Sequence, residues 1–597
     1  MSDPLLHGPP ATDRDHAVAT SNVEVARLLK ELATLTELDE GSPNAFRVRA
    51  YQNAERAVLT LDGDVADRSA ADLAKVKGIG KSIAGRIREY LDTGSIQRLD
   101  ELREKHPTSK VDLMKVPGLG PKSVQLLQDE LGITDMEGLA AGLEDGSVAQ
   151  LPGMGEKTVA NLTEAITKLG LTSKDQRIDI ADALPPAERI VAALEEVDGV
   201  EQAAYAGSLR RFRETIGDVD VLVGSDDPAA VTEAFMGLGE VDRVIGSGDT
   251  KTSVITTDGL QVDLRIVPPD SFGAALVYFT GSKAHNIRLR QRAIDRGWML
   301  NEYALAAKDG GDVVASKTEE DVYDALELPW IAPEQREDGG EIEAALDGSA
   351  PELPVVEDLR GDLHDHTDLS GDGRDSLEDL VAAAVDRGLD YLAITDHAED
   401  LTINGVSREQ MEEQRHALRE LEQSRGDIRL FHGSELNIGV DGSLDYDDDF
   451  LAGFDWLVAS VHSHFGRPVD EQTARVVAAI RHPSVTAIGH LTGRMLGKRP
   501  GIDLDLEAVL DAAAETGTAI EINASLRRLD APVEVIREGA RRGVTFVIST
   551  DAHAVGELER ARFGVAQARR AGLDRSVIAN TWSVERFSDW VDEVRRG

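Results

Sequence analysis

The stretch GSLRRFRETIGDVDVLV, residues 207–223, carries two carboxylates, Asp218 and Asp220, in an apolar segment typical of a β-strand. Residues i and i+2 of a strand point to the same face, so these two carboxylates lie side by side. Adjacent carboxylates repel each other unless a cation lies between them. The stretch therefore predicts a cation-binding strand, and the alternative is an exposed edge strand with chance acids.

A third carboxylate, Asp263, lies in a second apolar strand, LQVDLRIV (residues 260–267). Three carboxylates on adjacent strands suit two Mg²⁺ ions, which prefer oxygen ligands and stabilise the attacking and leaving oxygens of phosphoryl transfer. Gly207 and Ser208 precede a predicted helix whose arginines include Arg211. Hydroxyl, backbone amide and guanidinium groups together favour binding of a triphosphate.

These motifs resemble the nucleotidyltransferase signature of family X DNA polymerases, and the resemblance covers about residues 21–330. It continues in VDLRIVPPDSFGAALVYFTGSKAHNIRLRQRA (262–293) and in FRVRAYQNAERAV (46–58). It implies gap filling on gapped or nicked double-stranded DNA with deoxynucleoside triphosphates and two Mg²⁺ ions. The implied catalytic metal ligands are Asp218, Asp220 and Asp263, and the implied nucleotide contacts are Gly207, Ser208, Arg211, Tyr278, Phe279, Gly281 and Asn286.

Three of these positions also have plain structural interpretations. Tyr278 and Phe279 form a packed aromatic pair in the alternative interpretation, and Asn286 is a helix cap. The chain departs from the family at Gln261, where some relatives place an arginine two residues before the third aspartate. A glutamine still hydrogen-bonds a carboxylate but lacks the charge, so we expect a difference in the tuning of Asp263 and not in the activity.

Three segments share an apolar residue, a Gly-x-Gly turn and a helix: VKGIGKSIAGRIREYL (76–91), VPGLGPKSVQLLQDEL (116–131) and LPGMGEKTVANLTEAI (151–166). Glycine permits a tight turn, and the free amides of a helix N-terminus attract anions. The repeats resemble helix-hairpin-helix motifs, which grip DNA phosphates; the alternative for each is a plain turn between helices. The expected DNA contacts are Gly78, Gly80, Gly118, Gly120, Gly153, Gly155 and Arg86.

The composition is strongly acidic, with a formal charge of −45 and 16 lysines against 48 arginines. Such a charge ordinarily argues against DNA binding, which relies on basic side chains, but helix-hairpin-helix amides do not need them. Because the acids are spread over every segment, we interpret the surface as halophilic, with an ordinary acidic protein as the alternative. The chain has no cysteine and no apolar run of membrane-spanning length, so we expect a cytoplasmic monomer without membrane contact.

The last 240 residues hold ten of the fourteen histidines and seven short apolar segments that end in polar residues. Alternating strands and helices predict a parallel sheet, and polar residues at each carboxyl end predict a β/α barrel with its site on that face. The seven segments are RGDLHDHT, DYLAITDH, RLFHGSELNI, DWLVASVHS, VTAIGHL, AIEINAS and TFVISTDAH. Imidazole and carboxylate ligands suit Zn²⁺, Mn²⁺ or Fe²⁺.

This region, about residues 358–597, resembles the PHP domain of polymerases and histidinol phosphatases. The resemblance implies up to three metal ions and a 3′→5′ exonuclease or 3′-end phosphoesterase. The implied ligands are His364, His366, Asp372, His397, Glu435, His462, His490, Asp551 and His553. The ninth place stays open between Asp372 and Asp368, because HTDLSGDG has one residue more than the family's usual spacing.

Together the motifs predict a multidomain chain of α+β and α/β class with helix-hairpin-helix domains, a palm with a mixed sheet and a distorted seven-stranded β/α barrel. The expected divisions are a disordered tail (1–20), helical domains (21–100 and 101–175), palm (176–268), thumb (269–330), linker (331–357) and barrel (358–597). The alternatives are a template-independent nucleotidyltransferase, a DNA-binding scaffold with inactive sites, or a barrel that acts on small phosphate esters.

One further expectation concerns Arg86. Some family X polymerases remove a 5′-deoxyribose phosphate with a lysine eight residues after the first glycine of the first hairpin. Here that glycine is Gly78 and the position is Arg86, with Lys81 as the only nearby amine. A guanidinium stays protonated and cannot form a Schiff base, so the resemblance predicts little or no lyase activity.

Overall fold

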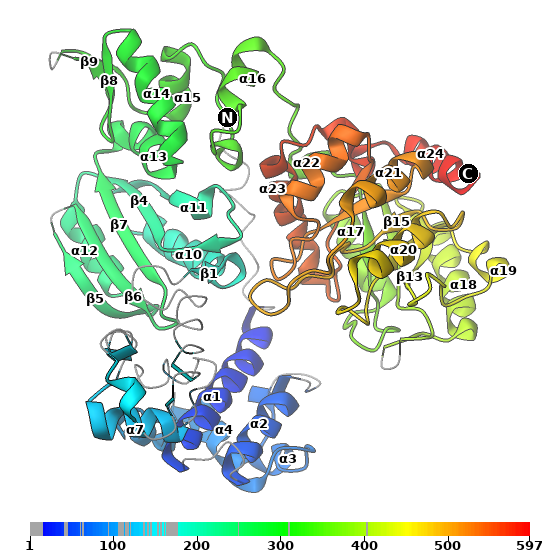
Figure 1. The fold of residues 1–597 in the computed structure, drawn as a ribbon, viewed down its shortest axis with the longest axis horizontal. Helices are drawn as coiled ribbons and strands as arrows, with labels where there is room; N and C mark the ends of the chain where they lie inside the picture. Colours follow the sequence, from blue (N-terminus) through cyan, green and yellow to red (C-terminus); the bar gives the residue numbers. More distant parts are fainter. Residues whose placement is uncertain are drawn as a thin grey trace. The chain divides into compact units, whose positions relative to one another are not determined.

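The computed structural model (Figure 1) describes residues 16–40, 46–59, 61, 65–93, 95–105, 113, 119, 121–134, 138–139, 142–143, 146–151, 154–155, 158–159, 162, 177–248, 250–308, 311–401 and 404–596. The chain divides into two compact units, His7–Arg177 and Ile178–Gly597. Among the described helices, no apolar stretch reaches the length of a membrane span.

The N-terminal unit is helical and holds two apolar cores, one within residues 25–102 and one within residues 113–162. Its elements are α1 (His16–Glu40), α2 (Phe46–Leu59), η1 (Val65–Asp67), α3 (Ala70–Leu73), α4 (Lys81–Thr93), α5 (Gln97–Lys105), α7 (Pro121–Leu131) and η2 (Val148–Gln150). Helix α1 begins at His16, within the range 1–20 of the predicted disordered tail, and contains no glycine or proline that would interrupt it. Residues 1–15 of that tail lie outside the described residues.

The first Gly-x-Gly turn precedes α4. Gly78 has a φ of +103°, and a Cβ atom there would lie 3.0 Å from the Asn53 carbonyl oxygen, so the turn requires glycine. The Gly80 carbonyl accepts hydrogen bonds from the amides of the first turn of α4. The Gly155 carbonyl accepts hydrogen bonds from the Thr158 and Val159 amides in the same way. Gly118, Gly120 and Gly153 lie outside the described residues.

The palm is a five-stranded mixed sheet with the order β2-β4-β7-β6-β5, in which β4 and β7 are parallel and the other neighbours antiparallel. The strands are β2 (Val200–Tyr205), β4 (Val219–Ser225), β5 (Val241–Ser247), β6 (Lys251–Thr256) and β7 (Gln261–Val267), with a separate pair β1 (Ile178–Asp179) and β3 (Thr215–Ile216). The helices are α10 (Ile180–Glu195), α11 (Gly207–Arg210) and α12 (Pro228–Met236). Apolar residues of α10 and α12 share one core with β4 and β7.

The thumb follows with helices that pack on a small antiparallel sheet. Its elements are η3 (Pro269–Ser271), α13 (Phe272–Thr280), α14 (Lys283–Asp295), β8 (Trp298–Leu300), β9 (Leu305–Ala307), β10 (Val313–Ala315) and α15 (Glu319–Ala325). Figure 1 shows α13, α14 and α15 beside β8 and β9.

The segment 331–357 is more ordered than the linker that its Gly, Pro and acidic composition predicts. It contains η4 (Pro333–Gln335), α16 (Glu341–Asp347) and η5 (Val356–Asp358). Glu334 is buried and lies 2.9 Å from Nε of Arg569 on the barrel. Its acids therefore form specific ion pairs, which composition alone does not reveal.

The barrel consists of seven parallel strands in sequence order. They are β11 (Gly361–Asp365), β12 (Tyr391–Ile394), β13 (Arg429–Asn437), β14 (Trp456–Ser460), β15 (Ala487–Ile488), β16 (Ala519–Asn523) and β17 (Phe546–Ser549). A parallel bridge between Asp365 and Ala552 nearly closes the ring. The predicted fold class, including the seven-stranded barrel, is confirmed.

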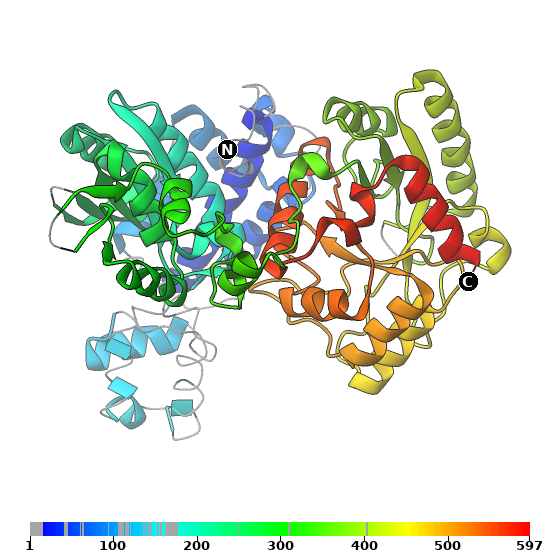
Figure 2. The same ribbon diagram turned by 90° about the horizontal axis from the view of Figure 1, so that it is seen from above.

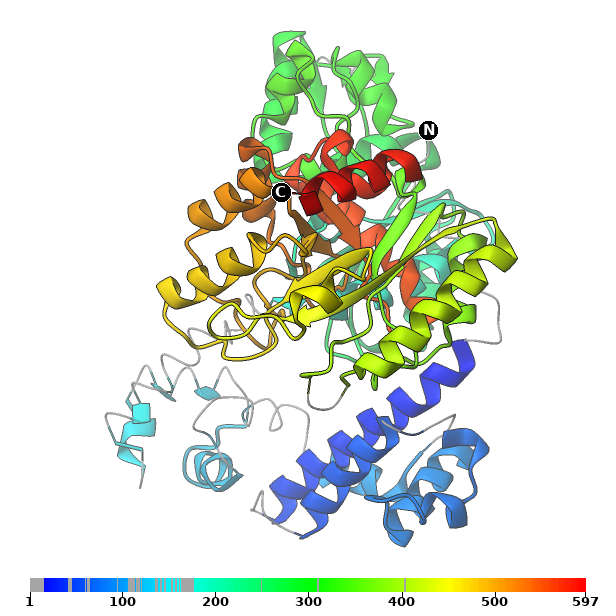
Figure 3. The ribbon, with the colours of Figure 1, turned by 90° about the vertical axis from the view of Figure 1, so that its right-hand side faces the viewer.

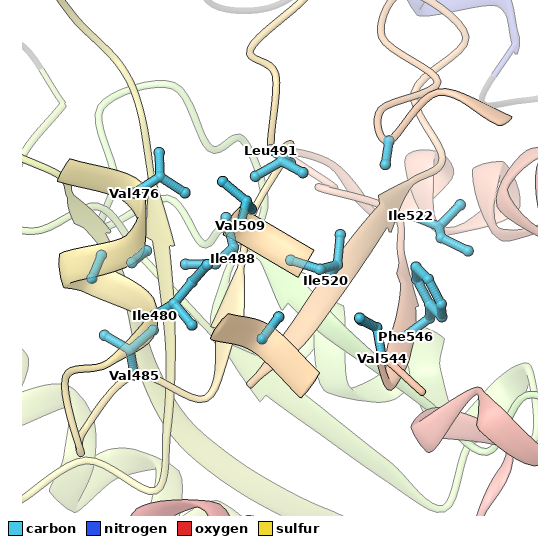
Figure 4. Close-up of a cluster of buried hydrophobic side chains, with 14 of the residues drawn as sticks. Val476, Ile480, Val485, Ile488, Leu491, Val509, Ile520, Ile522, Val544 and Phe546 are labelled. Atoms are coloured by element: carbon cyan, nitrogen blue, oxygen red, sulfur yellow. The ribbon is translucent and has the colours of Figure 1, made fainter. Parts of the chain in front are cut away.

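Helices surround the strands of the barrel (Figures 2 and 3). They are α17 (Leu377–Asp386), α18 (Arg408–Arg425), α19 (Asp448–Leu451), α20 (Val469–Ile480), α21 (Leu506–Thr516), α22 (Val533–Arg542), α23 (Ala561–Ala571) and α24 (Val584–Arg596), with 3₁₀ turns η6 (Val555–Arg560), η7 (Arg575–Val577) and η8 (Ala579–Thr581). Figure 4 shows Ile480 of α20 and Val509 of α21 against Ile488 of β15 and Ile520 of β16. This apolar layer holds the strands in place and leaves their carboxyl ends for polar side chains.

Candidate active sites

The palm carboxylates lie on the two central strands. The register of the parallel pair β4 and β7 places Asp220 directly beside Asp263, and Asp218 immediately precedes β4. Burial, followed by the charges of Asp218 and Asp263, raises the pKa of Asp220 to about 7. Three ionised carboxylates are stable together only with cations between them, so the residues fit a divalent metal site.

Asp263 accepts hydrogen bonds from neighbouring side chains. Nζ of Lys251 on β6 lies 2.8 Å from Oδ2, and Nε2 of Gln261 donates to Oδ1 at 3.1 Å. Burial acts to raise the pKa of Asp263. Several hydrogen bonds, of which the one from Lys251 has the largest effect, outweigh burial and hold this pKa below its ordinary value. Gln261 therefore makes the expected hydrogen bond. Lys251, which sequence reasoning missed, supplies a positive charge from the neighbouring strand.

The predicted triphosphate-binding residues surround the start of α11. Gly207 has a φ of +62°, and a Cβ atom there would lie 2.5 Å from Oδ2 of Asp220, so the backbone passes close to the carboxylates. Ser208 follows in the first turn. Arg211 donates to the Thr280 carbonyl oxygen at 2.5 Å and to Oε1 of Glu337 at 3.0 Å. Its guanidinium thus lies at the junction of palm and thumb.

The predicted nucleotide contacts of the thumb lie at the end of α13 and the start of α14. Tyr278 and Phe279 make an edge-to-face pair with ring centroids 5.1 Å apart, and Arg265 lies over Phe279 at 4.8 Å. Asn286 donates to the Tyr278 carbonyl at 2.7 Å, and its buried Oδ1 accepts no hydrogen bond from the described residues. Ser282, not Asn286, caps α14. The free Oδ1 is an acceptor that a ligand can satisfy.

The barrel brings the predicted histidines and carboxylates together at the carboxyl ends of its strands. Glu435 at the end of β13 is central, because three histidine nitrogens lie within 3.0 Å of its oxygens: Nδ1 of His397 (2.8 Å), Nε2 of His462 (3.0 Å) and Nε2 of His490 (2.9 Å). Three groups have the spacing of metal ligands: His366, His397 and His553; His364, His366 and Asp551; and His397, Glu435 and His462.

The histidines of these groups differ in protonation. Burial, followed by the charge of His397, lowers the pKa of His366 to about 3, so its imidazole is neutral. Both of its ring nitrogens are buried and make no hydrogen bond with the described residues. Asp551 lies 3.5 Å from Nε2 of His366 and stays ionised, because the His364 charge offsets its burial and keeps its pKa well below the ordinary value. Neutral imidazoles and ionised carboxylates are the forms that bind metal ions. Burial acts to lower the pKa of His397, but the Glu435 charge raises it to about 10, so His397 must lose a proton when a metal ion binds.

Comparison with known proteins identifies the domains of this chain. Residues 275–337 match the DNA polymerase beta thumb, 20–96 a helix-hairpin-helix domain, 110–168 a SAM-like helix-hairpin-helix tandem and 362–525 the PHP domain. The DNA polymerase/3′-5′ exonuclease PolX of Bacillus subtilis (strain 168) is 36% identical over 565 residues, which are 94% of this chain and 98% of the relative. The chain belongs to the PolX family of DNA polymerases.

Two further relatives each match one part of the family's architecture. DNA polymerase lambda of Rattus norvegicus is 25% identical over 52% of this chain and 56% of its own length. A probable phosphatase of Vibrio campbellii (strain ATCC BAA-1116) is 29% identical over 38% of this chain and 91% of its own length. The predicted family and the predicted class of enzyme are confirmed.

In this PolX family member, a buried ion-pair group joins palm and thumb. Glu319 of α15 lies 2.8 Å from NH1 of Arg210 and 2.6 Å from NH1 of Arg336. Burial acts to raise the pKa of Glu319, but Arg210 and then Arg336 bring it well below the ordinary value. Arg210 and Arg211 are adjacent in the sequence, but only Arg210 pairs with the buried Glu319, whereas Arg211 contacts Glu337 and the Thr280 carbonyl.

The structure distinguishes Asp372 from Asp368 as candidates for the ninth ligand of the barrel. Oδ2 of Asp372 lies 3.4 Å from Nε2 of His397 and 3.5 Å from Nε2 of His553, and Asn404 donates to it at 2.5 Å. Asp368 is exposed. The geometry favours Asp372, and its role as a ligand stays a prediction.

Sequence reasoning missed two residues of β16 that hold the ligands. Glu521 lies 2.6 Å from Nδ1 of His364 through Oε1, and its Oε2 accepts the His490 amide at 2.5 Å. Asn523 donates to Oδ2 of Asp551 at 3.0 Å. Such partners orient metal ligands and fix histidine tautomers. The available signal was an acid inside the apolar segment AIEINAS, the same signal that identified Asp220.

Four other histidines of the barrel region lie apart from these ligand groups. His416 and His464 are exposed, and His482 lies 3.3 Å from Asp448 near the surface. His432 is buried in β13 and stacks on Phe454 with ring centroids 4.8 Å apart.

Proposed function

We propose that the chain fills short gaps in double-stranded DNA and that its barrel removes nucleotides or blocking groups from the 3′ end. The observation that carries the polymerase half is the parallel register of Asp220 and Asp263, with Asp218 beside them. The barrel half is supported by the convergence of histidines and carboxylates on Glu435. The trimmed end of one reaction is then the primer end of the other.

For the palm, we propose Asp218, Asp220 and Asp263 as ligands of two Mg²⁺ ions, which when bound neutralise charge at the reacting phosphate. Ser208, the Gly207 backbone and Arg211 bind the triphosphate. In the structure, Arg211 pairs with Glu337. To bind the triphosphate, its guanidinium must release this carboxylate, because one edge of a guanidinium pairs with one anionic group at a time. Tyr278, Phe279, Gly281 and Asn286 orient the sugar and base of the incoming nucleotide.

For the barrel, we propose nine ligands, with Asp372 as the ninth, and up to three ions of Mn²⁺, Zn²⁺ or Fe²⁺. Bound there, such ions polarise the phosphoryl group and activate water. Glu521 and Asn523 hold His364 and Asp551 in orientation. The mixed imidazole and carboxylate set favours these borderline ions over Mg²⁺.

One reaction tests the proposed function. A gapped duplex with a labelled primer is incubated with Mg²⁺ or Mn²⁺, with and without the four deoxynucleoside triphosphates. We expect templated extension across the gap with nucleotides and 3′ shortening without them. Addition that ignores the template would support the template-independent alternative, and neither extension nor shortening would support an inactive scaffold.

We expect little or no Schiff-base lyase activity, because Arg86 replaces the catalytic lysine. Arg86 lies over the Tyr51 ring at 5.7 Å and donates to its hydroxyl, so it contributes a permanent charge and no free amine. The measurement is borohydride trapping on an incised abasic duplex, with Arg86→Lys as the gain-of-function control. A strong covalent adduct in the wild type that Lys81→Ala removes would contradict this prediction.

We also expect stability to increase with salt. Raising KCl from about 0.1 M to about 2 M shortens the Debye length to a few ångströms and screens the repulsion within a chain of charge −45. The melting temperature should therefore rise, as measured by calorimetry beside a protein of near-zero net charge. Unfolding at the higher concentration would contradict the halophilic interpretation.

We propose that the chain acts as a monomer in the cytoplasm. The lack of cysteine supports an intracellular location, because disulfides are common in secreted proteins. Light scattering of the full chain at its working salt concentration measures the oligomeric state directly.

A further inference from the structure

The loop after β16 lies between the palm core and the barrel metal centre. Leu529 is completely buried in the same apolar cluster as Ile180, Leu184 and Leu209 of the palm, and Leu526 packs against that cluster. Leu529 has a φ of +43°, an uncommon conformation for a side chain of this size. The loop is therefore held in one arrangement by apolar packing on its palm side.

Polar contacts fix the same loop. Both guanidinium nitrogens of Arg527 contact the Asp182 carboxylate of the palm, at 3.0 and 2.6 Å. Arg494 donates to the carbonyl of Arg528 at 2.8 Å and to Oε1 of Glu214 at 2.8 Å. The backbone at Arg528 is thus set by partners on both domains of the C-terminal unit.

The side chain of Arg528 points the other way, toward the ligands. Its Nε lies 3.8 Å from Oδ2 of Asp551, which is beyond hydrogen-bond distance. Within the described part of the chain, its guanidinium donates no hydrogen bond, and its side chain is 22% exposed. A fixed arginine with unused donors at the edge of a phosphoesterase centre has the chemistry of an anion site.

A second arginine lies close by. Arg499 donates to the Gly493 carbonyl and covers the Phe465 ring at 3.8 Å. Burial, followed by the Arg528 charge, lowers the pKa of Arg499, and the Asp530 charge acts in the opposite direction. A phosphate held by Arg528 therefore has a second cation nearby. A chain of charge −45 has little overall electrostatic attraction for DNA. A single arginine–phosphate contact therefore makes up a larger share of its affinity for DNA.

We propose that Arg528 binds a phosphate of the DNA strand whose 3′ end is processed in the barrel. This inference rests on the proposed function of the barrel. The guanidinium presents two parallel donors to phosphate oxygens and holds the strand end against the metal ligands, while the palm side of the loop keeps the arginine in place. Arg528 is a substrate-binding residue in this proposal, and it takes no part in proton transfer.

The test uses the full chain and the substitutions Arg528→Gln and Arg528→Lys. The matched control is Arg541→Gln, which removes the same charge from an exposed position of α22 in the same domain. The first measurement is binding of a labelled trinucleotide to chelator-treated protein by fluorescence anisotropy. The second is steady-state kinetics of the barrel reaction on single-stranded DNA with Mn²⁺, which gives KM and kcat separately.

We expect Arg528→Gln to raise the trinucleotide Kd and the KM about tenfold and to leave kcat within about twofold, as for loss of a charged hydrogen bond. Arg528→Lys should recover part of the affinity, and Arg541→Gln should match the wild type. An unchanged Kd and KM in Arg528→Gln would overturn the proposal, as would a loss of kcat alone, which indicates an effect through Asp551. If wild-type protein does not shorten DNA, the proposed function fails, and the trinucleotide measurement still decides the role of Arg528.

Discussion

Replacing Asp220 by asparagine should abolish nucleotide addition, with a fall in the polymerisation rate of about 10³-fold or more. Metal ions contribute several kcal/mol to stabilising charge in a phosphoryl-transfer transition state, and each 1.4 kcal/mol or so is a factor of ten. The charges of both Asp218 and Asp263 act on Asp220, so this carboxylate would hold metal ions together with either neighbour. The measurement is single-nucleotide insertion into a gapped duplex with Mg²⁺.

The control for Asp220→Asn is the barrel reaction in the same preparation. Shortening of the 3′ end should be unchanged, because the barrel ligands come from other strands. Burial, followed by the charges of Asp218 and Asp263, raises the pKa of Asp220 to about 7, so an ionised carboxylate is unfavourable at this position. The metal-free variant, which has a neutral amide there, should therefore be at least as thermally stable as the wild type. Loss of both activities in a folded variant would contradict two independent centres.

Replacing Asp551 by asparagine should reduce 3′ processing by about 10³-fold while polymerisation persists. Asp551 lies 3.5 Å from His366 and 3.8 Å from His364, so it supplies the negative charge of that ligand group. An amide of the same size keeps the hydrogen-bonding shape and removes that charge, which weakens metal binding. The measurements are 3′ shortening of a labelled primer and metal content by elemental analysis.

A histidine outside the ligand groups gives the matched control for the barrel. His482 lies near the surface beside Asp448, and His482→Gln should retain metal, 3′ shortening and polymerisation. Full nuclease activity in Asp551→Asn, purified free of contaminating nucleases, would show that the barrel is not the nuclease. Loss of metal without loss of shortening would place the reaction elsewhere in the chain.

The local signals in the sequence were sufficient for the family and for both groups of acids and histidines. Asp218 and Asp220 alternate with apolar residues, and that pattern predicts a strand with both carboxylates on one face. The barrel strands each end in polar residues, which predicts a shared site because parallel strands present their carboxyl ends together. Both signals are local in the chain, so a single sequence reveals them.

Contacts between distant segments could not be predicted in the same way. Lys251 reaches Asp263 only because β6 pairs with β7, and Glu521 reaches His364 across 157 positions of sequence. The inserted residue in HTDLSGDG left Asp368 and Asp372 open, and the turn geometry places Asp372 beside His397. Register and turn geometry depend on the whole fold, so no periodic pattern in the sequence predicts them.

By itself, the sequence predicted the order of domains, the strand-borne carboxylates, the histidine cluster and the replacement of a lyase lysine by Arg86. Only the tertiary structure decided that Arg210 is buried with Glu319 while Arg211 contacts Glu337, that Glu334 pairs with Arg569 of the barrel, and that Arg528 lies beside Asp551. The physical reason is the distance along the chain over which each effect acts. Periodicity and side-chain chemistry act over a few residues, whereas burial and ion pairing depend on which distant segments the core brings together.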